Sequence, residues 1–285
     1  NLGVAYVFSR KTMDQQEILT PPSGDSTLYF GKALSVDDNR LAIRSLKERA
    51  SDGVKTGAAY FFHKIAGRWK HQYTFVSDGA AEFLSSGSVV LDGDLALVGM
   101  PSGAPAGAVN VLEFSSGKWN VKTTLTGAGE GSRFGESVAL SGETALIGDP
   151  SGKGRAHVYR RSKGGWVREA TLTPPQSRRS LTGSGEAVAI GNGHALVSGT
   201  RVEGGTTEYL VDLFVRSSND EWNRAVTIIG AGQSSDTQFG HSMALDQGRA
   251  LIGAPKEDLV FESESNGDGQ RIINNGAAYL HHLES

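Results

Sequence analysis

Short apolar runs alternate with polar turn residues along the whole chain, and the runs have the length of strands rather than of helices. They are rich in Val, Ile, Tyr, Phe and Thr and are bounded by Gly, Asp, Asn and Ser. Pairs such as Asp92-Gly93 and Asn192-Gly193 separate neighbouring runs and supply the positive φ that a tight hairpin needs. No helical stripe of useful length is present. The pattern predicts an all-β fold of antiparallel hairpins.

One segment is written five times: an apolar run opened by Phe-Gly, a tight turn, and a second run ending near Gly-Ala-Pro. Its fullest copies are residues 134–150 and 239–255. When the copies are aligned, equivalent residues form columns. The first column, the residue that opens each copy, recurs about every 50 residues, at Phe30, Ser85, Phe134, Ser184 and Phe239. A third apolar run follows each copy. In four repeats a fourth run follows, opened by a tryptophan: Trp69, Trp119, Trp166 and Trp222.

Each repeat therefore predicts a four-stranded antiparallel meander. One such sheet cannot bury both of its faces alone, so the copies must pack on one another, which is typical of β-propeller blades. We expect residues 1–285 to form a single propeller domain of about five blades. The blades begin near residues 30, 85, 134, 184 and 239.

The two ends of the chain leave the blade count open. Residues 3–8 read as a third strand and 13–19 as a fourth, whereas 276–281 read as a third strand with no fourth after it. Strands within residues 3–20 either complete the last blade of a ring closed within this chain or belong to a preceding blade. In the second case the chain is a stretch of a six- or seven-bladed ring.

Composition excludes several classes of protein. Of 285 residues, 38% are hydrophobic, enough for a large core, and the 38 glycines suit many tight turns. No run approaches the roughly 18 apolar residues of a membrane helix, so no direct membrane insertion is expected. The net charge of −3 offers no basic patch and argues against nucleic acid as a partner. The absence of cysteine excludes disulfides and leaves the redox compartment open.

The repeat resembles a known family. Phe-Gly-x-Ser-Val-Ala-Leu, Ala-Leu-Ile-Gly-Ala-Pro, Gly-x-Ala-Tyr-Val-Phe and Trp-x5-Leu-Thr are similar to the FG-GAP repeat of the integrin α-subunit propeller and of bacterial surface and secreted proteins. The resemblance covers essentially the whole chain. It implies a propeller that binds other molecules, as in cell adhesion, from its loop faces. It also implies an extracellular, cell-surface or periplasmic location.

The repeat columns separate packing positions from variable ones. We expect the Phe to pack between blades and the Gly to stand where no side chain fits. The position after the glycine varies freely, which indicates a tunable surface near the central axis. Its candidates for binding are Lys32, Glu136, Glu186 and His241, with Gly87 in the second repeat.

Calcium is the one candidate cofactor. The resemblance implies acidic metal loops between first and second strands, but these turns hold only two or three residues, too few to wrap a cation that takes six to eight oxygens. The connection between second and third strands of the last repeat keeps suitable oxygen ligands. Its candidate metal ligands are Glu262, Glu264, Asn266 and Asp268, and its candidate partner-binding residues are these four with Asp258 and Gln270. A solvated acidic loop is the alternative.

No catalytic residue is assigned. The seven histidines are scattered and lack metal-ligand spacing. The sequence therefore favours a non-catalytic recognition or scaffold module that binds a protein or glycan partner through its loops, alone or within a larger chain or complex. The alternative is a glycan-active enzyme or lectin-like subunit with carboxylates near the axis, of which Glu136 and Glu186 are the repeat-equivalent pair.

Overall fold

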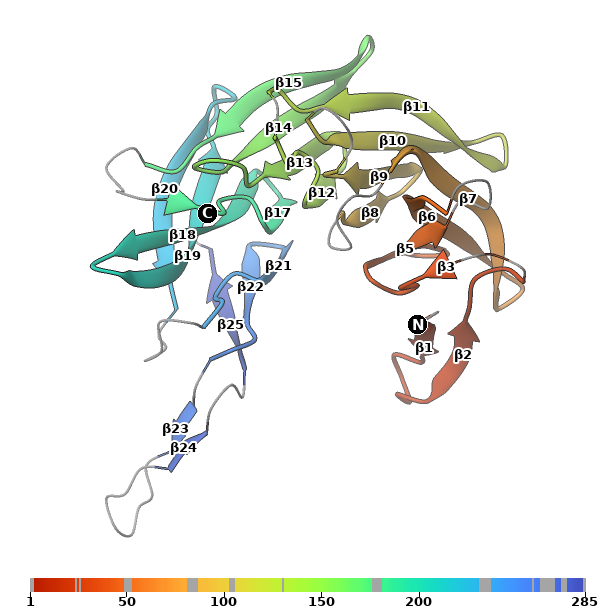
Figure 1. Ribbon diagram of the computed structural model, residues 1–285, viewed down its shortest axis with the longest axis horizontal. Helices are drawn as coiled ribbons and strands as arrows, with labels where there is room; N and C mark the ends of the chain where they lie inside the picture. Colours follow the sequence, from red (N-terminus) through yellow and green to blue (C-terminus); the bar gives the residue numbers. More distant parts are fainter. Residues whose placement is uncertain are drawn as a thin grey trace. The chain divides into compact units, whose positions relative to one another are not determined.

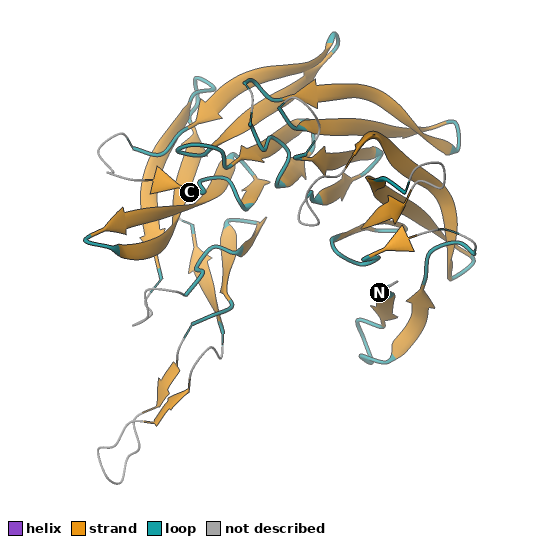
Figure 2. Cartoon of the chain, viewed as in Figure 1, coloured by secondary structure: helices purple, strands orange, loops and turns teal. Residues whose placement is uncertain are grey.

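The chain is built of strands joined by turns. The computed structural model describes residues 3–23, 25, 27–48, 53–80, 87–102, 106–129, 131–175, 181–230, 237–257, 259–261, 270–272 and 276–283. Within these ranges every regular element is a β-strand, which confirms the all-β prediction (Figure 2). Correspondingly, the same ranges hold no helix long and apolar enough to cross a membrane.

Two compact units divide the chain, Asn1–Val138 and Ala139–Ser285. The first unit begins with a two-stranded sheet, β1 (Ala5–Phe8) and β2 (Gln15–Leu19). Blade 1 follows and contains β3 (Thr27–Leu28), β4 (Leu34–Asp37), β5 (Arg40–Glu48), β6 (Lys55–Ile65) and β7 (Arg68–Ala80). Blade 2 contains β8 (Val89–Asp92), β9 (Leu95–Met100), β10 (Ala108–Ser115) and β11 (Lys118–Thr126) (Figure 1).

The second unit holds three further blades. Blade 3 contains β12 (Val138–Ser141), whose first residue closes the first unit, β13 (Thr144–Asp149), β14 (Arg155–Ser162) and β15 (Gly165–Leu172). Blade 4 contains β16 (Leu181–Thr182), β17 (Val188–Gly191), β18 (His194–Glu203), β19 (Thr206–Arg216) and β20 (Trp222–Ile229). Blade 5 contains β21 (Ser242–Asp246), β22 (Arg249–Ala254) and β25 (Ala277–His282). A separate hairpin between its last two strands contains β23 (Leu259–Phe261) and β24 (Gln270–Ile272).

The predicted four-stranded meander is confirmed in blades 1 to 4, where strands that follow one another in the chain pair antiparallel. The structure adds one feature that the repeat did not predict. In blades 1 and 4 the second strand runs on past the first, and a short strand covers the extension: β3 on β5 and β16 on β18. These short strands supply partners for backbone groups of the extended edge.

The glycine and phenylalanine columns pack as expected. Phe30, Phe134 and Phe239 are only 3%, 1% and 1% exposed. Phe30 lies edge-on to Tyr60 at a ring-centroid distance of 5.4 Å, and Phe239 lies edge-on to Tyr279 at 5.2 Å. The glycines that follow the column, Gly31, Gly135, Gly185 and Gly240, have φ between +85° and +94°, a conformation open to glycine.

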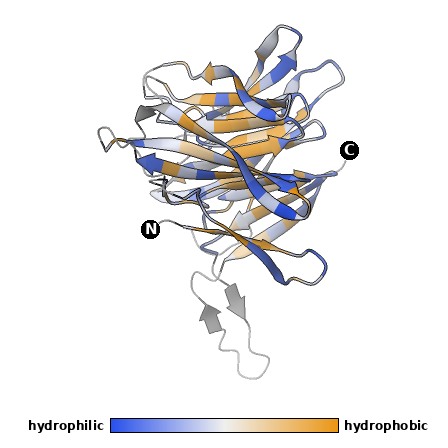
Figure 3. Ribbon diagram, turned by 90° about the vertical axis from the view of Figure 1, so that its right-hand side faces the viewer, coloured by the Kyte–Doolittle hydropathy of each residue, from blue (hydrophilic) through white to orange (hydrophobic). Residues whose placement is uncertain are grey.

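Apolar residues of neighbouring sheets within each unit form the cores. In the first unit Ala42 and Phe61 of blade 1 share a cluster with Val98 and Leu112 of blade 2. In the second unit Leu146 and Val158 of blade 3 share one with Val197 and Phe214 of blade 4. Hydrophobic residues recur along the strands, and hydrophilic residues gather at many turns (Figure 3). Blade 2 therefore buries a face of blade 1, and blade 4 buries a face of blade 3.

Candidate functional site

A polar cavity of about 160 Å³ lies at the turn end of blades 3 and 4, and we call it the Trp222 pocket. It is lined by Ser141, Thr144, Ile190, Asn192, Gly193, Arg216 and Trp222.

Tight turns place most of these residues. Ser141 and Thr144 flank the two-residue turn between β12 and β13. Asn192 and Gly193 form the turn between β17 and β18, with φ of +48° and +74°, as the Asn-Gly pair predicts. The backbone N–H of Arg216, at the end of β19, donates to the Gly193 carbonyl at 2.8 Å. Side chains from two neighbouring hairpins are thereby held around one space.

Two buried nitrogen donors in the lining have no hydrogen-bond partner: Nε of Arg216 and Nε1 of Trp222. The other end of the guanidinium is anchored, because Nη2 of Arg216 lies 2.6 Å from Oε1 of Glu169 and 3.2 Å from Oδ1 of Asp220. A buried donor without an acceptor costs roughly 1–3 kcal/mol. The lining is therefore suited to a ligand that brings acceptor oxygens.

The equivalent place between blades 1 and 2 is filled by an arginine. Arg40 opens β5 at the repeat position where Thr144 opens β13. Its guanidinium carbon lies 4.3 Å from the ring centroid of Phe114 and 5.9 Å from that of Trp119. Its Nη1 donates to the Gly93 carbonyl at 2.7 Å and lies 2.7 Å from Oδ1 of Asp94. The pocket is therefore present between blades 3 and 4, where Thr144 stands in place of the arginine.

The structure places the four variable-column residues in different surroundings. Lys32 lies 5.9 Å above the ring of Tyr29. Glu136 is 12% exposed at its side chain and pairs with Arg133 at 2.8 Å. Glu186 and His241 are exposed. Because Lys32 and Glu136 belong to the first unit and the other two to the second, their grouping around a common axis stays a prediction.

The acidic connection of blade 5 is only partly described. Asp258, Glu262, Glu264, Asn266 and Asp268 lie outside the described residues. Gln270 begins β24 and stands opposite Phe261 in the hairpin register. Calcium binding and partner binding by this connection stay predictions. Among the described residues no group of three or more His, Asp or Glu side chains is placed to hold a metal ion.

One arrangement in blade 3 has the composition of a catalytic triad. Nδ1 of His157 lies 3.2 Å from the Thr171 hydroxyl, and its Nε2 lies 3.8 Å from Oδ2 of the buried Asp149. The same cross-strand position holds a polar residue opposite a threonine in other blades, where Thr124 donates to Asn110 and Thr227 donates to Asp212. This recurrence identifies the threonine contact as a feature of the sheet, since Asn110 and Asp212 make it without a histidine.

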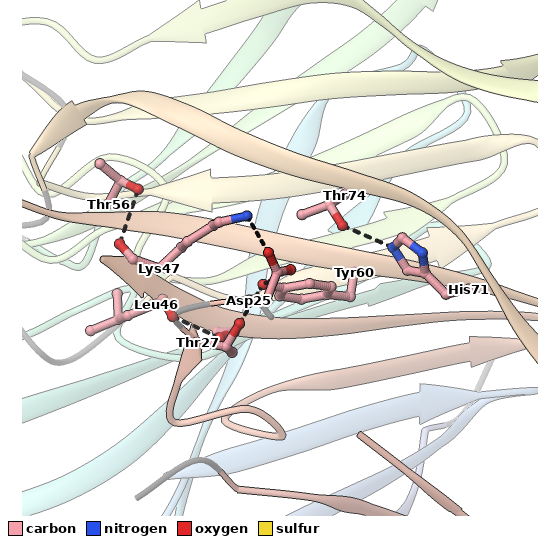
Figure 4. A network of polar contacts seen from close by, with 9 residues as sticks. Asp25, Thr27, Leu46, Lys47, Thr56, Tyr60, His71 and Thr74 are labelled. Atoms are coloured by element: carbon pink, nitrogen blue, oxygen red, sulfur yellow. Dashed lines mark hydrogen bonds and ion pairs between the residues drawn. The ribbon is translucent and has the colours of Figure 1, made fainter. Parts of the chain in front are cut away.

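Asp25 is the centre of a polar network in blade 1 (Figure 4). Its two carboxylate oxygens lie 2.6 Å from Nζ of Lys47 and 3.1 Å from the Tyr60 hydroxyl, which donates to it. The Tyr60 hydroxyl also lies 2.6 Å from that of Thr27. Burial raises the pKa of Tyr60 to about 12, with a smaller contribution from the Asp25 charge and an opposing one from the Thr27 hydrogen bond. The network fixes the segment before β3 to the sheet.

Replacing Tyr60 by Phe is expected to lower the unfolding free energy by about 1–2 kcal/mol at pH 7, because Thr27 and Asp25 each lose a buried partner. An unfolded tyrosine has a pKa near 10. The raised folded value therefore contributes stability that is complete below pH 10 and is lost as pH rises through about 12. Urea titrations between pH 7 and 12 should show a shallower alkaline decline in the variant. The exposed Tyr6→Phe is the control, and an equal effect there would contradict this assignment.

Comparisons with known proteins give only distant structural likenesses. No protein family and no curated protein matches the sequence. The solved structure of a periplasmic gluconolactonase from Pseudomonas aeruginosa is similar over 96% of this chain and 93% of its own, with 14% identity and a TM-score of 0.39. A variant of the GH32 β-fructofuranosidase of Bombyx mori, in complex with sucrose, is similar over 80% of this chain and 54% of its own, with 12% identity and a TM-score of 0.45. Neither likeness bears on the chemistry of this chain.

The Trp222 pocket involves residues that motif reading passed over. Trp222 belongs to the tryptophan column, which the sequence pattern identified only as the start of the fourth run. Arg216 and Thr144 stand at positions where the residue type changes from one repeat to the next. One signal in the sequence could have indicated the pocket. The column that holds Arg40 in the first repeat holds Thr144 in the third, so a long charged side chain is replaced by a short one at a blade boundary.

Proposed function

We propose that this chain is a non-catalytic recognition module that binds a saccharide unit in the Trp222 pocket. The observation that carries the proposal is the pair of buried, unpartnered donors, Nε of Arg216 and Nε1 of Trp222, in a cavity whose counterpart is filled by Arg40.

The chemistry of the lining favours a neutral, hydroxyl-rich ligand. Ring and hydroxyl oxygens of a sugar accept from the two N–H groups, while Ser141, Thr144 and Asn192 can both donate and accept. A cationic ligand is disfavoured, because Gly193 stands where blade 2 has Asp94 and the charge of Arg216 is adjacent. A cavity of about 160 Å³ is smaller than the roughly 300–1,000 Å³ of typical ligand sites and suits one sugar ring.

The same lining supports recognition rather than catalysis. Two carboxylates, Glu169 and Asp220, pair with the Arg216 of this lining. Glu136, a candidate for the alternative glycan-active enzyme, is paired with Arg133. A glycosidase needs two carboxylates across a groove. We place the module in the extracellular, cell-surface or periplasmic setting that the FG-GAP resemblance implies, with its acidic loop as a second contact for a protein partner.

Titration with methyl glycosides of glucose, galactose, mannose and N-acetylglucosamine, followed by tryptophan fluorescence and calorimetry, tests the proposal. We expect at least one to bind with a Kd near 1 mM, about 4 kcal/mol of binding free energy. Thr144→Arg, which copies Arg40, should fill the pocket and weaken binding at least tenfold. Trp222→Phe keeps an aromatic ring at this position, removes the indole N–H donor and should weaken binding about fivefold, equivalent to about 1 kcal/mol.

Trp166→Phe is the matched control, since Trp166 holds the same column in blade 3 and does not line the pocket. It should bind as the parent does. Binding that survives Thr144→Arg, or no binding to any of the four glycosides, would refute the site. Hydrolysis of an oligosaccharide that disappears in Glu136→Gln or Glu186→Gln would instead establish the enzyme alternative.

A further inference from the structure

Blade 5 carries a second concavity, of about 450 Å³. It lies where β22 ends and β25 begins, away from the tight turn that joins β21 to β22. Besides His241 and Ser242 it is lined by small residues, and we call this set the blade 5 seat: Gly253, Ala254, Pro255, Gly276, Ala277 and Ala278. It shares no residue with the Trp222 pocket.

In blades 2, 3 and 4 the same positions receive the glycine that opens the next repeat, from a Phe-Gly or Ser-Gly pair. A Cβ built on Gly135 would lie 2.5 Å from the Ala108 carbonyl oxygen and 3.2 Å from the Met100 nitrogen, the equivalents of Ala277 and Ala254. The contact recurs at three other described glycines: Gly31 with Val4, Gly185 with Arg155 and Asp149, and Gly240 with Leu210 and Val211. The close approach requires glycine in the incoming strand.

The glycine before the third strand shows that the seat of blade 5 has the same form. Gly3, Gly107 and Gly154 have φ of +75°, +73° and +71°, and each approaches the carbonyl of the next repeat's first-column residue, Phe30, Phe134 or Ser184. Gly276 has the same φ, +74°, but the nearest atom to its Cβ position is the Pro255 carbonyl oxygen at 3.3 Å. The backbone of the seat is therefore already in its receiving conformation.

The apolar face beside the seat is exposed where the equivalent faces of other blades are buried. Leu251 and Leu280 are 48% and 59% exposed. At the position of Leu251, Ala42, Leu97, Leu146 and Leu196 are all fully buried. At the position of Leu280, Phe61, Val111, Val158 and Leu213 are at most 6% exposed. In blades 1, 3 and 4 these residues pack against the following blade of the same unit. Blade 5 thus presents a face of the kind that a following blade covers.

We infer that blade 5 binds a further blade of this same repeat type, whose Phe-Gly enters the blade 5 seat and whose apolar strands cover Leu251 and Leu280. A second copy of this chain is a poor source, because its described first-column phenylalanines, Phe30, Phe134 and Phe239, are already buried. The occupant is therefore a repeat whose first-column phenylalanine is not already buried in this way. Its recognition element is a strand that begins with Phe-Gly and continues with alternating apolar residues.

A labelled synthetic peptide with the sequence of residues 133–145, which contains Phe134-Gly135, is the probe, and fluorescence anisotropy with the intact chain is the readout. The parent peptide should bind, and a peptide with Ala in place of Gly135 should bind at least tenfold more weakly. Amide exchange should slow at Gly253, Ala254 and Ala277 on binding. Failure of the parent peptide to bind at millimolar concentration, or equal binding of both peptides, overturns the inference.

Ala278→Trp blocks the seat from the protein side, because its equivalents Val109 and Val211 point at the incoming glycine, 3.0 Å and 2.7 Å from its Cβ position. The variant should lose peptide binding while its circular dichroism stays that of the parent. Val167→Trp, at a 60% exposed position of β15, is the control and should bind normally. Unchanged peptide binding by folded Ala278→Trp also overturns the inference.

Discussion

Replacing Gly99 by Ala is expected to destabilise the first compact unit by about 4 kcal/mol or more, the range in which a single substitution is exceptional. Gly99 lies within β9, and a Cβ there would stand 2.1 Å from the carbonyl oxygen of Gly135 and 3.1 Å from its carbonyl carbon. Both atoms belong to the backbone of the next repeat, so neither can rotate away. The first strand of that repeat would have to move off blade 2.

Urea denaturation followed by tryptophan fluorescence measures this effect, and much of the variant should be unfolded without denaturant, since whole domains are stable by only about 5–15 kcal/mol. Gly164→Ala is the matched control. Gly164 also avoids positive φ, and the nearest atom to its Cβ position is the Ser162 hydroxyl at 4.0 Å. A loss of less than about 1 kcal/mol in Gly99→Ala, or equal losses in both variants, would contradict the close contact between repeats.

The contact at Gly99 explains why the repeat could be read from the sequence. The Phe and Gly columns recur because the same bare backbone, and in three of the five repeats the same aromatic side chain, make the contact with the neighbouring repeat at the same place. Periodicity therefore predicted the strands, the meander and the packing roles of Phe30 and Phe134. The short strands β3 and β16 were not predicted, since they depend on how far β5 and β18 extend, which no repeat column records.

The Trp222 pocket could not be predicted in the same way. It depends on how far one side chain reaches across a blade boundary. The structure shows that Arg40 lies over Phe114 and Trp119, and only then does the change to Thr144 indicate a cavity. Calcium binding by the acidic residues of the blade 5 connection stays a prediction. Their composition suggested a calcium loop, but composition alone does not bring oxygens to one point.

Arg44 is a departure from the repeat that sequence reading passed over. It stands in β5 at the position held by Gly99, Ser198 and Gly253 in other blades, and its side chain is almost fully buried. Three of its nitrogens donate to backbone carbonyls: Nε to Gly87 at 3.3 Å, Nη1 to Ala58 at 3.1 Å and Nη2 to Gly99 at 3.0 Å. Within the described residues no carboxylate pairs with it. Burial lowers the pKa of Arg44 to about 10, so the guanidinium remains charged at neutral pH.

This arginine joins two blades, because Ala58 belongs to blade 1 while Gly87 and Gly99 belong to blade 2. Replacing Arg44 by Met keeps most of the side-chain volume and removes every donor, so three buried carbonyls lose their partners together. The expected loss is about 3 kcal/mol of unfolding free energy, since each orphaned buried group costs roughly 1–3 kcal/mol and partial hydration recovers some of it.

Arg68→Met is the matched control for this substitution, because Arg68 is exposed at the start of β7, and its effect should stay within about 0.5 kcal/mol. Urea midpoints of the two variants measure the difference, and amide exchange should accelerate at Gly99 and Ala58 in Arg44→Met. A buried charge can also be replaced by an apolar side chain at little cost when packing is good. Equal stability of Arg44→Met and the parent would therefore show that the guanidinium fills space between the blades without holding them together.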